Sequence, residues 1–229
     1  MTLKVLSAGA AKALVQRVAA LEGIELDAEF GAVGAMRERL DSGAACDVIV
    51  LTQPMMDMLA ADGVVDAASV VALGRVHTGV AVPTEAPVAQ VDTIASLKQL
   101  LSAASSIYLP DPVRSTAGIH CIKVFTALGL SASHSARFKS FANGAAAMRA
   151  MADAGDASAV GITQCSEILY TEGACLLGAL PSEFALTTVY SAAITMNAHD
   201  PASAARLLNA LVWAGARTMR IEGGFQPAD

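Results

Sequence analysis

The stretch RVHTGVAVP, residues 75–83, divides the chain into two halves of similar pattern. Its valines, its threonine and its terminal proline predict an extended segment. Before it, short β-branched runs alternate with alanine-rich helical runs, beginning with the strand LKVLSA (3–8) and the helix AAKALVQRVAALEG (10–23). This alternation is typical of a parallel sheet that is covered by helices.

A second series of the same kind follows residue 83. We expect helices at 93–104, 116–129 and 144–155, and strands at 106–110, 137–141, 158–163 and 174–180. The run LTTVYSAAITM (186–196) is again extended, and a helix at 200–215 opens with Asp200 as its N-cap. The chain therefore leaves a first α/β unit, builds a second and returns to the first.

This order predicts an α/β protein of two Rossmann-like lobes that are joined by a two-strand hinge. Lobe 1 is discontinuous and comprises residues 1–80 and 197–229, and lobe 2 comprises residues 81–196. We expect a ligand cleft between the lobes, because domain interfaces are favoured places for small-ligand sites.

The composition excludes several classes of protein. Hydrophobic residues make up 54% of the chain and charged residues 16%, which is typical of a globular fold. The net charge of −6 argues against a nucleic-acid-binding surface. We expect no cofactor and no metal, because the cysteines lack metal-site spacing and fit buried free thiols. They are Cys46, Cys121, Cys165 and Cys175.

The same pattern bears on location and assembly. No apolar run reaches the length of about 18 residues that a membrane span needs, so we expect no membrane insertion. Residues 1–8 pass directly into a strand rather than a secretory leader, which favours a cytoplasmic protein. The alternative is a periplasmic protein whose leader has been removed. We expect a monomer.

The segment DPVRSTAGIH, residues 111–120, is the main candidate for a ligand site. Asp111 and Pro112 favour a turn after a strand, and Ser115 or Thr116 suits a helix N-cap. Unpaired N–H groups at residues 116–118, which include Ala117, would favour an anion. Arg114 would add a bidentate contact to a carboxylate. The alternative is an ordinary capped helix with a surface arginine.

His120 lies four residues after Thr116, so both side chains share one helix face. It would donate a hydrogen bond to a carboxylate or move a proton. We expect Ile119 and Ile122, with Phe125 and Leu128, to take the core side of this helix. The alternative is a partly exposed histidine without a role.

Further candidates follow the ends of other expected strands, where open α/β sheets place their ligands. Arg75 and His77 lie in the first extended run, and Tyr190 lies in the second, where hinge packing is its alternative role. We expect His134 and His199 to be solvent-exposed in loops. The remaining candidates are Ser7, Gly9, Ala10, Val33, Gly34 and Gln164, with Ser166 just after Gln164.

Five segments together resemble a known family. They are SAGA after the first strand, FGAVGAM before RLDSGAACDVIVL, the block STAGIHCIKVFTALG, then VGITQCSEIL and TVYSAAI. In this order they resemble the bacterial solute-binding proteins of the type II periplasmic-binding-protein fold, particularly the molybdate-binding branch. The resemblance covers almost the whole chain. It implies two lobes, a ligand held between helix N-termini and, for an exported protein, an ABC transporter permease as partner.

The sequence departs from the molybdate-binding pattern at the expected ligand contacts. Ala10 and Val33 stand where hydroxyl-bearing residues would be expected, and Gln164 stands in place of a tyrosine. The turn around Ala117 is kept. A related branch that lacks those serines includes proteins for organic anions and an enzyme, aconitate isomerase.

Two hypotheses follow. The preferred one is a clamp that binds a small anion, with di- or tricarboxylates bound better than molybdate or tungstate. The alternative is a cytosolic isomerase of an unsaturated polycarboxylate, in which His120 moves a proton and helix N-termini stabilise the developing charge.

Overall fold

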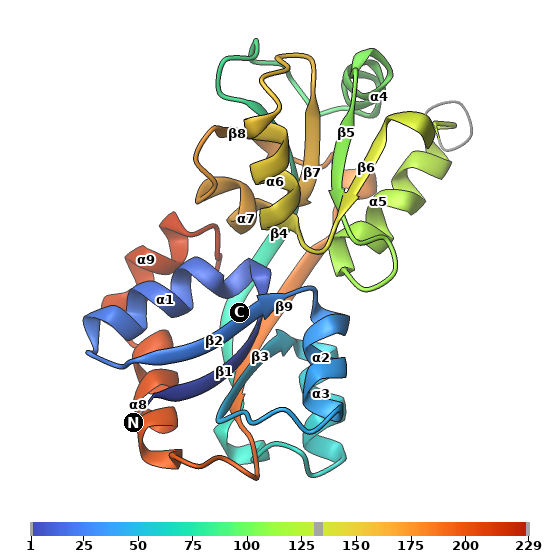
Figure 1. Ribbon diagram of the computed structural model, residues 1–229. Coiled ribbons are helices and arrows are strands. Elements are labelled where there is room, and N and C mark those ends of the chain that lie inside the picture. The colour runs from blue at the N-terminus through green and yellow to red at the C-terminus, as the bar shows by residue number, and fades with distance from the viewer. Residues whose placement is uncertain (1, 131–134, 228–229) are drawn as a thin grey trace. The chain divides into compact units, whose positions relative to one another are not determined.

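The computed structural model describes residues 2–130 and 135–227. The chain forms two compact units, and it crosses between them twice (Figure 1). Unit 1 comprises Met1–Val76 and Thr188–Asp229, and unit 2 comprises His77–Thr187. The structure has these crossings at 76/77 and 187/188, whereas the sequence analysis set them later, at 80/81 and 196/197. Both crossings fall in extended strands, in which pattern alone does not indicate where one unit ends.

Unit 1 contains the first three strand–helix pairs and the C-terminal helices. Its elements are β1 (Leu3–Ala8), α1 (Lys12–Leu21), β2 (Leu26–Gly31), α2 (Val33–Asp41), β3 (Val48–Thr52), α3 (Gln53–Ala61), the start of β4 (Val71–Pro83), most of β9 (Thr187–Ile194), α8 (Pro201–Val212) and α9 (Arg217–Glu222). Short 3₁₀ turns, η1, η2 and η5, occupy Gly9–Ala11, Ala67–Ser69 and Ala214–Ala216.

Unit 2 begins within β4 and ends at the start of β9. Its own elements are α4 (Ile94–Ala103), β5 (Ile107–Pro110), α5 (Thr116–Ala127), β6 (Phe138–Phe141), α6 (Gly144–Asp153), β7 (Val160–Gln164), α7 (Cys165–Leu169) and β8 (Ala174–Ala179), with 3₁₀ turns η3 and η4 at Ser135–Arg137 and Ser182–Phe184. The predicted α/β fold is confirmed, and the elements match the expected ones within a few residues.

The sheet of unit 1 has the strand order β2-β1-β3-β9. β1 pairs in parallel with β2 and β3, whereas β9 runs antiparallel to β3. Figure 1 shows α1 and α8 on one side of this sheet and α2 and α3 on the other. Because β3 is covered on both faces, all five of its residues are buried, which explains its continuous apolar sequence VIVLT.

The sheet of unit 2 is mixed rather than parallel. β5 pairs in parallel with β6 and β7, but β4 runs antiparallel to both β7 and β8. The stretch RVHTGVAVP is therefore more than a connection between units, because its second half is an interior strand of this sheet. An interior strand must bury both faces, and residues 78–83 of β4 are all buried.

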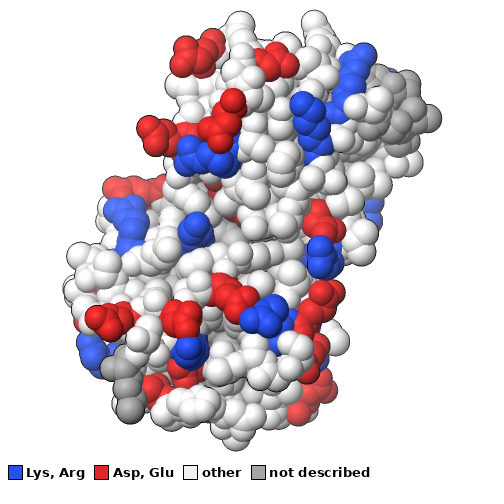
Figure 2. Space-filling view, in the orientation of Figure 1, with Lys and Arg blue, Asp and Glu red and all other residues white. Residues whose placement is uncertain are grey.

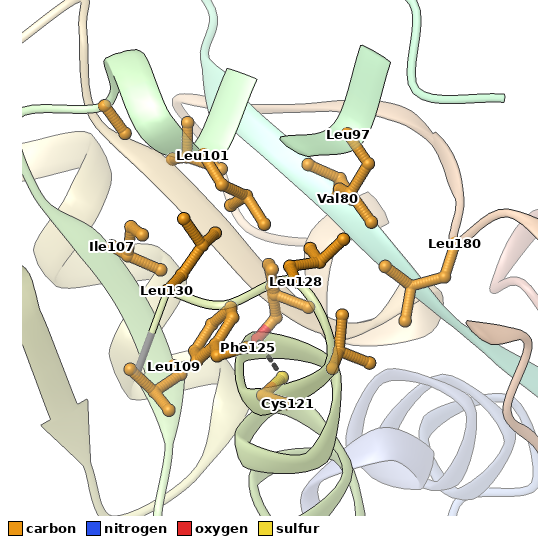
Figure 3. Close-up of a cluster of buried hydrophobic side chains, with 14 of the residues drawn as sticks. Val80, Leu97, Leu101, Ile107, Leu109, Cys121, Phe125, Leu128, Leu130 and Leu180 are labelled. Atoms are coloured by element: carbon orange, nitrogen blue, oxygen red, sulfur yellow. Dashed lines mark hydrogen bonds between the residues drawn. The ribbon is translucent and has the colours of Figure 1, made fainter. Parts of the chain in front are cut away.

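The largest core cluster of unit 2 lies on the side of the sheet that α4 and α5 cover. Val80 of β4 and Ile162 of β7 contribute to it from the sheet. Figure 3 shows Phe125 of α5 inside this cluster, with Leu97, Leu101, Leu109 and Leu128 around it. The ring of Phe125 also stacks on Phe138, with 4.6 Å between centroids.

The face of α5 that packs on the sheet differs from the expected one. Ile119 and Ile122 are 40% and 37% exposed, so the prediction that they face the core is wrong. The buried positions are Ala117, Gly118, Cys121, Val124 and Phe125. Their spacing follows the 3.6-residue period of a helix, whereas the expected spacing of three drifts around the helix surface.

The cysteines, helices, charges and histidines bear on the expectations from composition. All four cysteines are free thiols; three are buried, and Cys175 is partly buried. No helix in the described part of the chain is long and apolar enough to cross a bilayer. On the face drawn in Figure 2, basic and acidic side chains are interspersed, without a continuous basic stripe. His199 is exposed, as expected, and His134 lies outside the described residues.

The packing of α5 predicts unequal effects of two truncations. Phe125→Ala should lower the free energy of unfolding by about 3–5 kcal/mol, because it empties a fully buried position. Ile122→Ala on the neighbouring exposed face should cost about 1 kcal/mol or less. Urea unfolding followed by far-UV circular dichroism measures both. Equal losses would contradict the assigned face of α5.

Candidate functional site: polar strand ends in each unit

In unit 1 the candidate site is the edge at which three parallel strands end. β1, β2 and β3 end at Ala8, Gly31 and Thr52, and a helical turn begins within two residues of each. None of the helices α1, α2 and α3 has a side-chain hydrogen bond at its N-cap. The first-turn N–H groups of α2 and α3 are therefore suited to an anion that approaches this edge, whereas the N–H of Lys12, the first residue of α1, donates to the carbonyl oxygen of Gly9.

Five of the sequence-predicted residues lie at this edge. Ala8 is in register with Gly31, so the turn containing Gly9 and Ala10 adjoins the one containing Val33 and Gly34. The hydroxyl of Ser7 donates to the backbone carbonyl oxygen of the next residue, Ala8, at 3.0 Å. The side chains at this edge thus offer few donors, and the backbone offers more.

Tyr190 and Arg75 make contacts inside unit 1. Tyr190 is in register with Thr52, but its side chain is 2% exposed and meets the ring of Phe225 edge-on at 6.2 Å. Nε of Arg75 donates to the carbonyl oxygen of Pro227 at 3.0 Å. The ring of Tyr190 thus packs on Phe225 within unit 1, and Arg75 binds the C-terminal segment.

In unit 2 the first turn of α5 carries free backbone donors. Ser115 is the N-cap, and its hydroxyl oxygen accepts from the N–H of Gly118 at 3.4 Å. The N–H groups of Thr116 and Ala117 have no acceptor within the described residues, although Ala117 is 1% exposed. Buried N–H groups are almost always paired, so this turn is suited to an external acceptor. Gly118, expected to contribute a third N–H, is instead used by the cap.

The turn before α5 is organised by Asp111. Its carboxylate accepts from the backbone N–H groups of Arg114 and Val113 and pairs with the guanidinium of Arg114 at 2.9 Å. These hydrogen bonds, first that of the Arg114 backbone, hold the pKa of Asp111 below its usual range. The sequence predicted that Arg114 binds a carboxylate of the ligand. In the structure its guanidinium pairs with the carboxylate of Asp111.

Two buried hydroxyls lie at the same end of the unit 2 sheet. Thr78 of β4 is opposite Gln164, the last residue of β7, and Ser166 follows two residues later. Thr78 and Ser166 are each 1% exposed, and their hydroxyls have no hydrogen-bond partner in the described part of the chain. Sequence analysis selected Gln164 and Ser166, which follow a strand, but it missed Thr78, since burial without a partner leaves no mark in a sequence.

Strand alternation places Thr78 and Gln164 on the α5 side of the sheet. Side chains two residues apart on a strand share a face. Val80 lies two residues after Thr78, and Ile162 lies two residues before Gln164. Both belong to the core cluster under α5. The ends of β5 and β7 lie at one edge because these strands are parallel, and α5 begins six residues after β5. The buried hydroxyl of Thr78 and the free N–H groups of α5 therefore converge on one edge.

The two candidate histidines of unit 2 both contact the segment that leads out of it. Nε2 of His120 lies 2.8 Å from the carbonyl oxygen of Phe184. Nδ1 of His77 lies 2.9 Å from the hydroxyl of Thr187. His120 follows the first turn of α5 directly. His77 of β4 contacts Thr187 of β9, and these are the two strands along which the chain enters and leaves unit 2.

A family model described as bacterial extracellular solute-binding protein matches residues 3–226. The chain belongs to this family. Aconitate isomerase from a Pseudomonas species is 29% identical to this solute-binding protein over 236 residues, which cover 99% of the chain and 88% of the relative.

Solved structures of periplasmic binding proteins share the fold. A periplasmic molybdate-binding protein from Azotobacter vinelandii superimposes with a TM-score of 0.80 at 18% identity, covering 99% of this chain and 100% of the other. The sulfate-binding protein SubI from Mycobacterium tuberculosis superimposes with a TM-score of 0.71 at 16% identity, covering 100% and 88%. At these identities the likeness establishes the fold.

Glu167 is a buried residue of this solute-binding protein that sequence analysis did not identify. Its carboxylate accepts from the hydroxyl of Thr163 at 2.6 Å and from the backbone N–H groups of Ala145, Gln164 and Gly144. Burial raises the pKa of Glu167, and these four donors oppose that rise. The chain's own carboxylate therefore occupies the N-terminus of α6, which leaves the first turn of α5 for a ligand.

The turn at Asp111 predicts a pH-dependent difference in stability. A carboxylate with a lowered pKa stabilises the fold above its unfolded pKa, about 3.9, and loses that effect as the pH falls through the folded value. Asp111→Asn should therefore cost about 0.5–1.5 kcal/mol at neutral pH, and the difference from wild type should shrink below about pH 4. Urea unfolding across this range tests it, and a constant difference would contradict the account.

Proposed function

We propose that the protein captures a small anion that carries carboxylate groups. Membership of the solute-binding family supports the capture of a small solute. The related structures that bind molybdate and sulfate support an anion. The relative named aconitate isomerase supports a carboxylate in particular.

The observation that carries this proposal is the set of unpaired donors at the edge of unit 2. It consists of the N–H of Ala117 and the hydroxyls of Thr78 and Ser166, which are buried and have no partner among the described residues. Buried polar groups without partners are rare in native proteins and call for an explanation. A carboxylate supplies the missing acceptors, since its two oxygens accept about four hydrogen bonds.

The edge of unit 1 supports a carboxylate over a tetrahedral oxyanion. Ala10 and Val33 carry no hydroxyl, and the hydroxyl of Ser7 donates to its own chain. We propose that the backbone N–H groups of this edge, at Ala10 and Val33–Gly34, bind a carboxylate group. The donors of unit 2, near Ser115, Thr116, Ala117 and Gln164, are proposed to bind a carboxylate group as well.

Of the other sequence-predicted contacts, Arg75, His77, Arg114 and Tyr190 stay predictions as ligand contacts. Location in the cytoplasm, a monomeric state and, for an exported protein, an ABC transporter permease as partner stay predictions. Size-exclusion chromatography with light scattering measures the monomeric state directly.

The proposed ligand class predicts a clear order of affinity. Di- or tricarboxylates such as aconitate, citrate or succinate should bind more tightly than molybdate, tungstate or sulfate. The tetrahedral oxyanions would lack hydroxyl donors in unit 1, and each unmade hydrogen bond costs about 1–3 kcal/mol. Isothermal titration calorimetry under identical conditions compares them. Tight molybdate binding together with no carboxylate binding would overturn the proposal.

Thr78 predicts opposite effects on stability and on ligand affinity. Thr78→Val keeps the shape of the side chain and removes a buried hydroxyl that has no internal partner. The free protein should become no less stable and up to about 1–3 kcal/mol more stable, because the burial of an unpaired hydroxyl is unfavourable. Carboxylate affinity should fall about tenfold, which corresponds to the loss of one hydrogen bond.

Thr171→Val is the matched control for this experiment. Thr171 is also a buried threonine of unit 2, but its hydroxyl donates to the carbonyl oxygen of Glu167 at 2.6 Å. Its replacement should lower stability and leave the affinity unchanged. If Thr78→Val behaved like Thr171→Val in both measurements, the hydroxyl of Thr78 would have no role in binding.

A further inference from the structure

Glu167 is a buried carboxylate without a basic partner among the described residues. It is 4% exposed, and it accepts from the hydroxyl of Thr163 at 2.6 Å and from three backbone N–H groups. No described lysine, arginine or histidine is among the groups that act on its pKa. A charge that leaves water without meeting an opposite charge is unfavourable, so such a group favours its protonated form. Burial accordingly raises the pKa of Glu167.

The elements that pack against α7 are α6, β7 and β8. Ile168, the neighbour of Glu167, lies in a core cluster with Ala147 and Met148 of α6. The other ionisable residues of these elements, and of α7 with its C-cap, are two exposed side chains, two thiols and a phenol: Arg149, Asp153, Cys165, Cys175 and Tyr170. Burial, and after it the charge of Glu167, raises the pKa of Tyr170, so this phenol keeps its proton at neutral pH. The charge of Glu167 is therefore balanced by hydrogen bonds alone.

The contact with Thr163 suits both protonation states of Glu167. In the charged form the hydroxyl of Thr163 donates to the carboxylate. In the neutral form the carboxyl O–H donates to the oxygen of Thr163, because a hydroxyl both donates and accepts and its hydrogen rotates. A protonated carboxyl group also keeps acceptor capacity for the backbone N–H groups. Glu167 can therefore gain or lose a proton without a change of partners.

Glu167 and the candidate anion site share one short piece of chain. The N–H of Gln164 donates to Glu167, while the side chain of Gln164 lies on the α5 side with Thr78. Ser166, whose buried hydroxyl has no partner among the described residues, directly precedes Glu167. A ligand carboxylate bound by Ser166 would therefore lie on the order of 10 Å from that of Glu167. At an effective dielectric constant of about 20, two negative charges at this distance raise each other's pKa by about one unit.

From this arrangement we infer that Glu167 binds a proton from solvent together with the anionic ligand. The inference rests on the proposed carboxylate-binding function and adds a proton site to it. The ionised side chain repels a bound anion, whereas the neutral side chain does not. The ligand is therefore bound more tightly when Glu167 is protonated, and its affinity falls as the pH rises through the pKa of Glu167 in the free protein.

The decisive experiment compares wild type with Glu167→Gln by isothermal titration calorimetry between about pH 5 and pH 9. The probe is the tightest binder among aconitate, citrate and succinate. Glutamine has the shape of the neutral glutamic acid and cannot ionise. The two proteins should bind the probe alike at low pH, and wild type should bind it about tenfold more weakly at high pH. The titration of the probe itself affects both proteins equally, so it cancels in the ratio.

The proton is counted by the same method. Wild-type titrations in buffers of different ionisation enthalpy should show an uptake of up to about half a proton per ligand, which Glu167→Gln lacks. Asp156→Asn is the matched control. Asp156 is also a carboxylate of unit 2, but hydrogen bonds from Ser105 and then Ser158 lower its pKa to about 2, so it stays charged throughout. This variant should keep the uptake of wild type.

A further measurement needs no substitution. Carbon-13 NMR of the glutamate carboxyl groups follows Glu167 directly, and its pKa should rise by about one unit when the probe saturates the protein. An unchanged pKa would overturn the inference, whether or not Glu167→Gln folds.

The outcomes separate this inference from the proposed function. If Glu167→Gln takes up as many protons as wild type and has the same pH dependence, the proton enters elsewhere, for example at His120. The inference then fails and the binding proposal stands. If wild type binds none of the three carboxylates, the proposed function itself fails.

Discussion

The antiparallel pairing of β4 with β7 is the constraint on which the candidate site of unit 2 depends. It sets Thr78 opposite Gln164, at the end of the sheet where β5 and β7 both terminate. The parallel pairing of β5 with β7 then brings the start of α5 to the same edge. Three unrelated stretches of sequence, around residues 78, 116 and 165, supply one group of donors because two strand registers agree.

The alternation of strands and helices was enough to predict the fold. Short β-branched runs followed by alanine-rich helices leave few arrangements open, and the second extended run implied that the chain returns to its first unit. The direction of the interior strand β4 was not predictable in this way. A run of buried residues fits a parallel or an antiparallel strand equally well, and only its neighbours decide.

The candidate site was predictable where local chemistry determines structure. Ser115 caps α5 as its residue type suggests, and the N–H groups of Thr116 and Ala117 are free as a consequence. Arg114 shows the limit of this approach. A carboxylate three residues earlier, Asp111, was visible in the sequence and is a common local partner for arginine, but the ligand interpretation ignored it. Thr78 and Glu167 depend on tertiary burial, which no local pattern reports.

The close packing around Gly144 links residues that are distant in the chain. A β-carbon at this position would clash with the hydroxyl oxygen of Thr163 and with a carboxylate oxygen of Glu167. Position 144 can therefore carry a side chain only where the side chains at positions 163 and 167 have become smaller or moved away. Among descendants of this chain, a substitution of Gly144 should appear only after changes at those two positions.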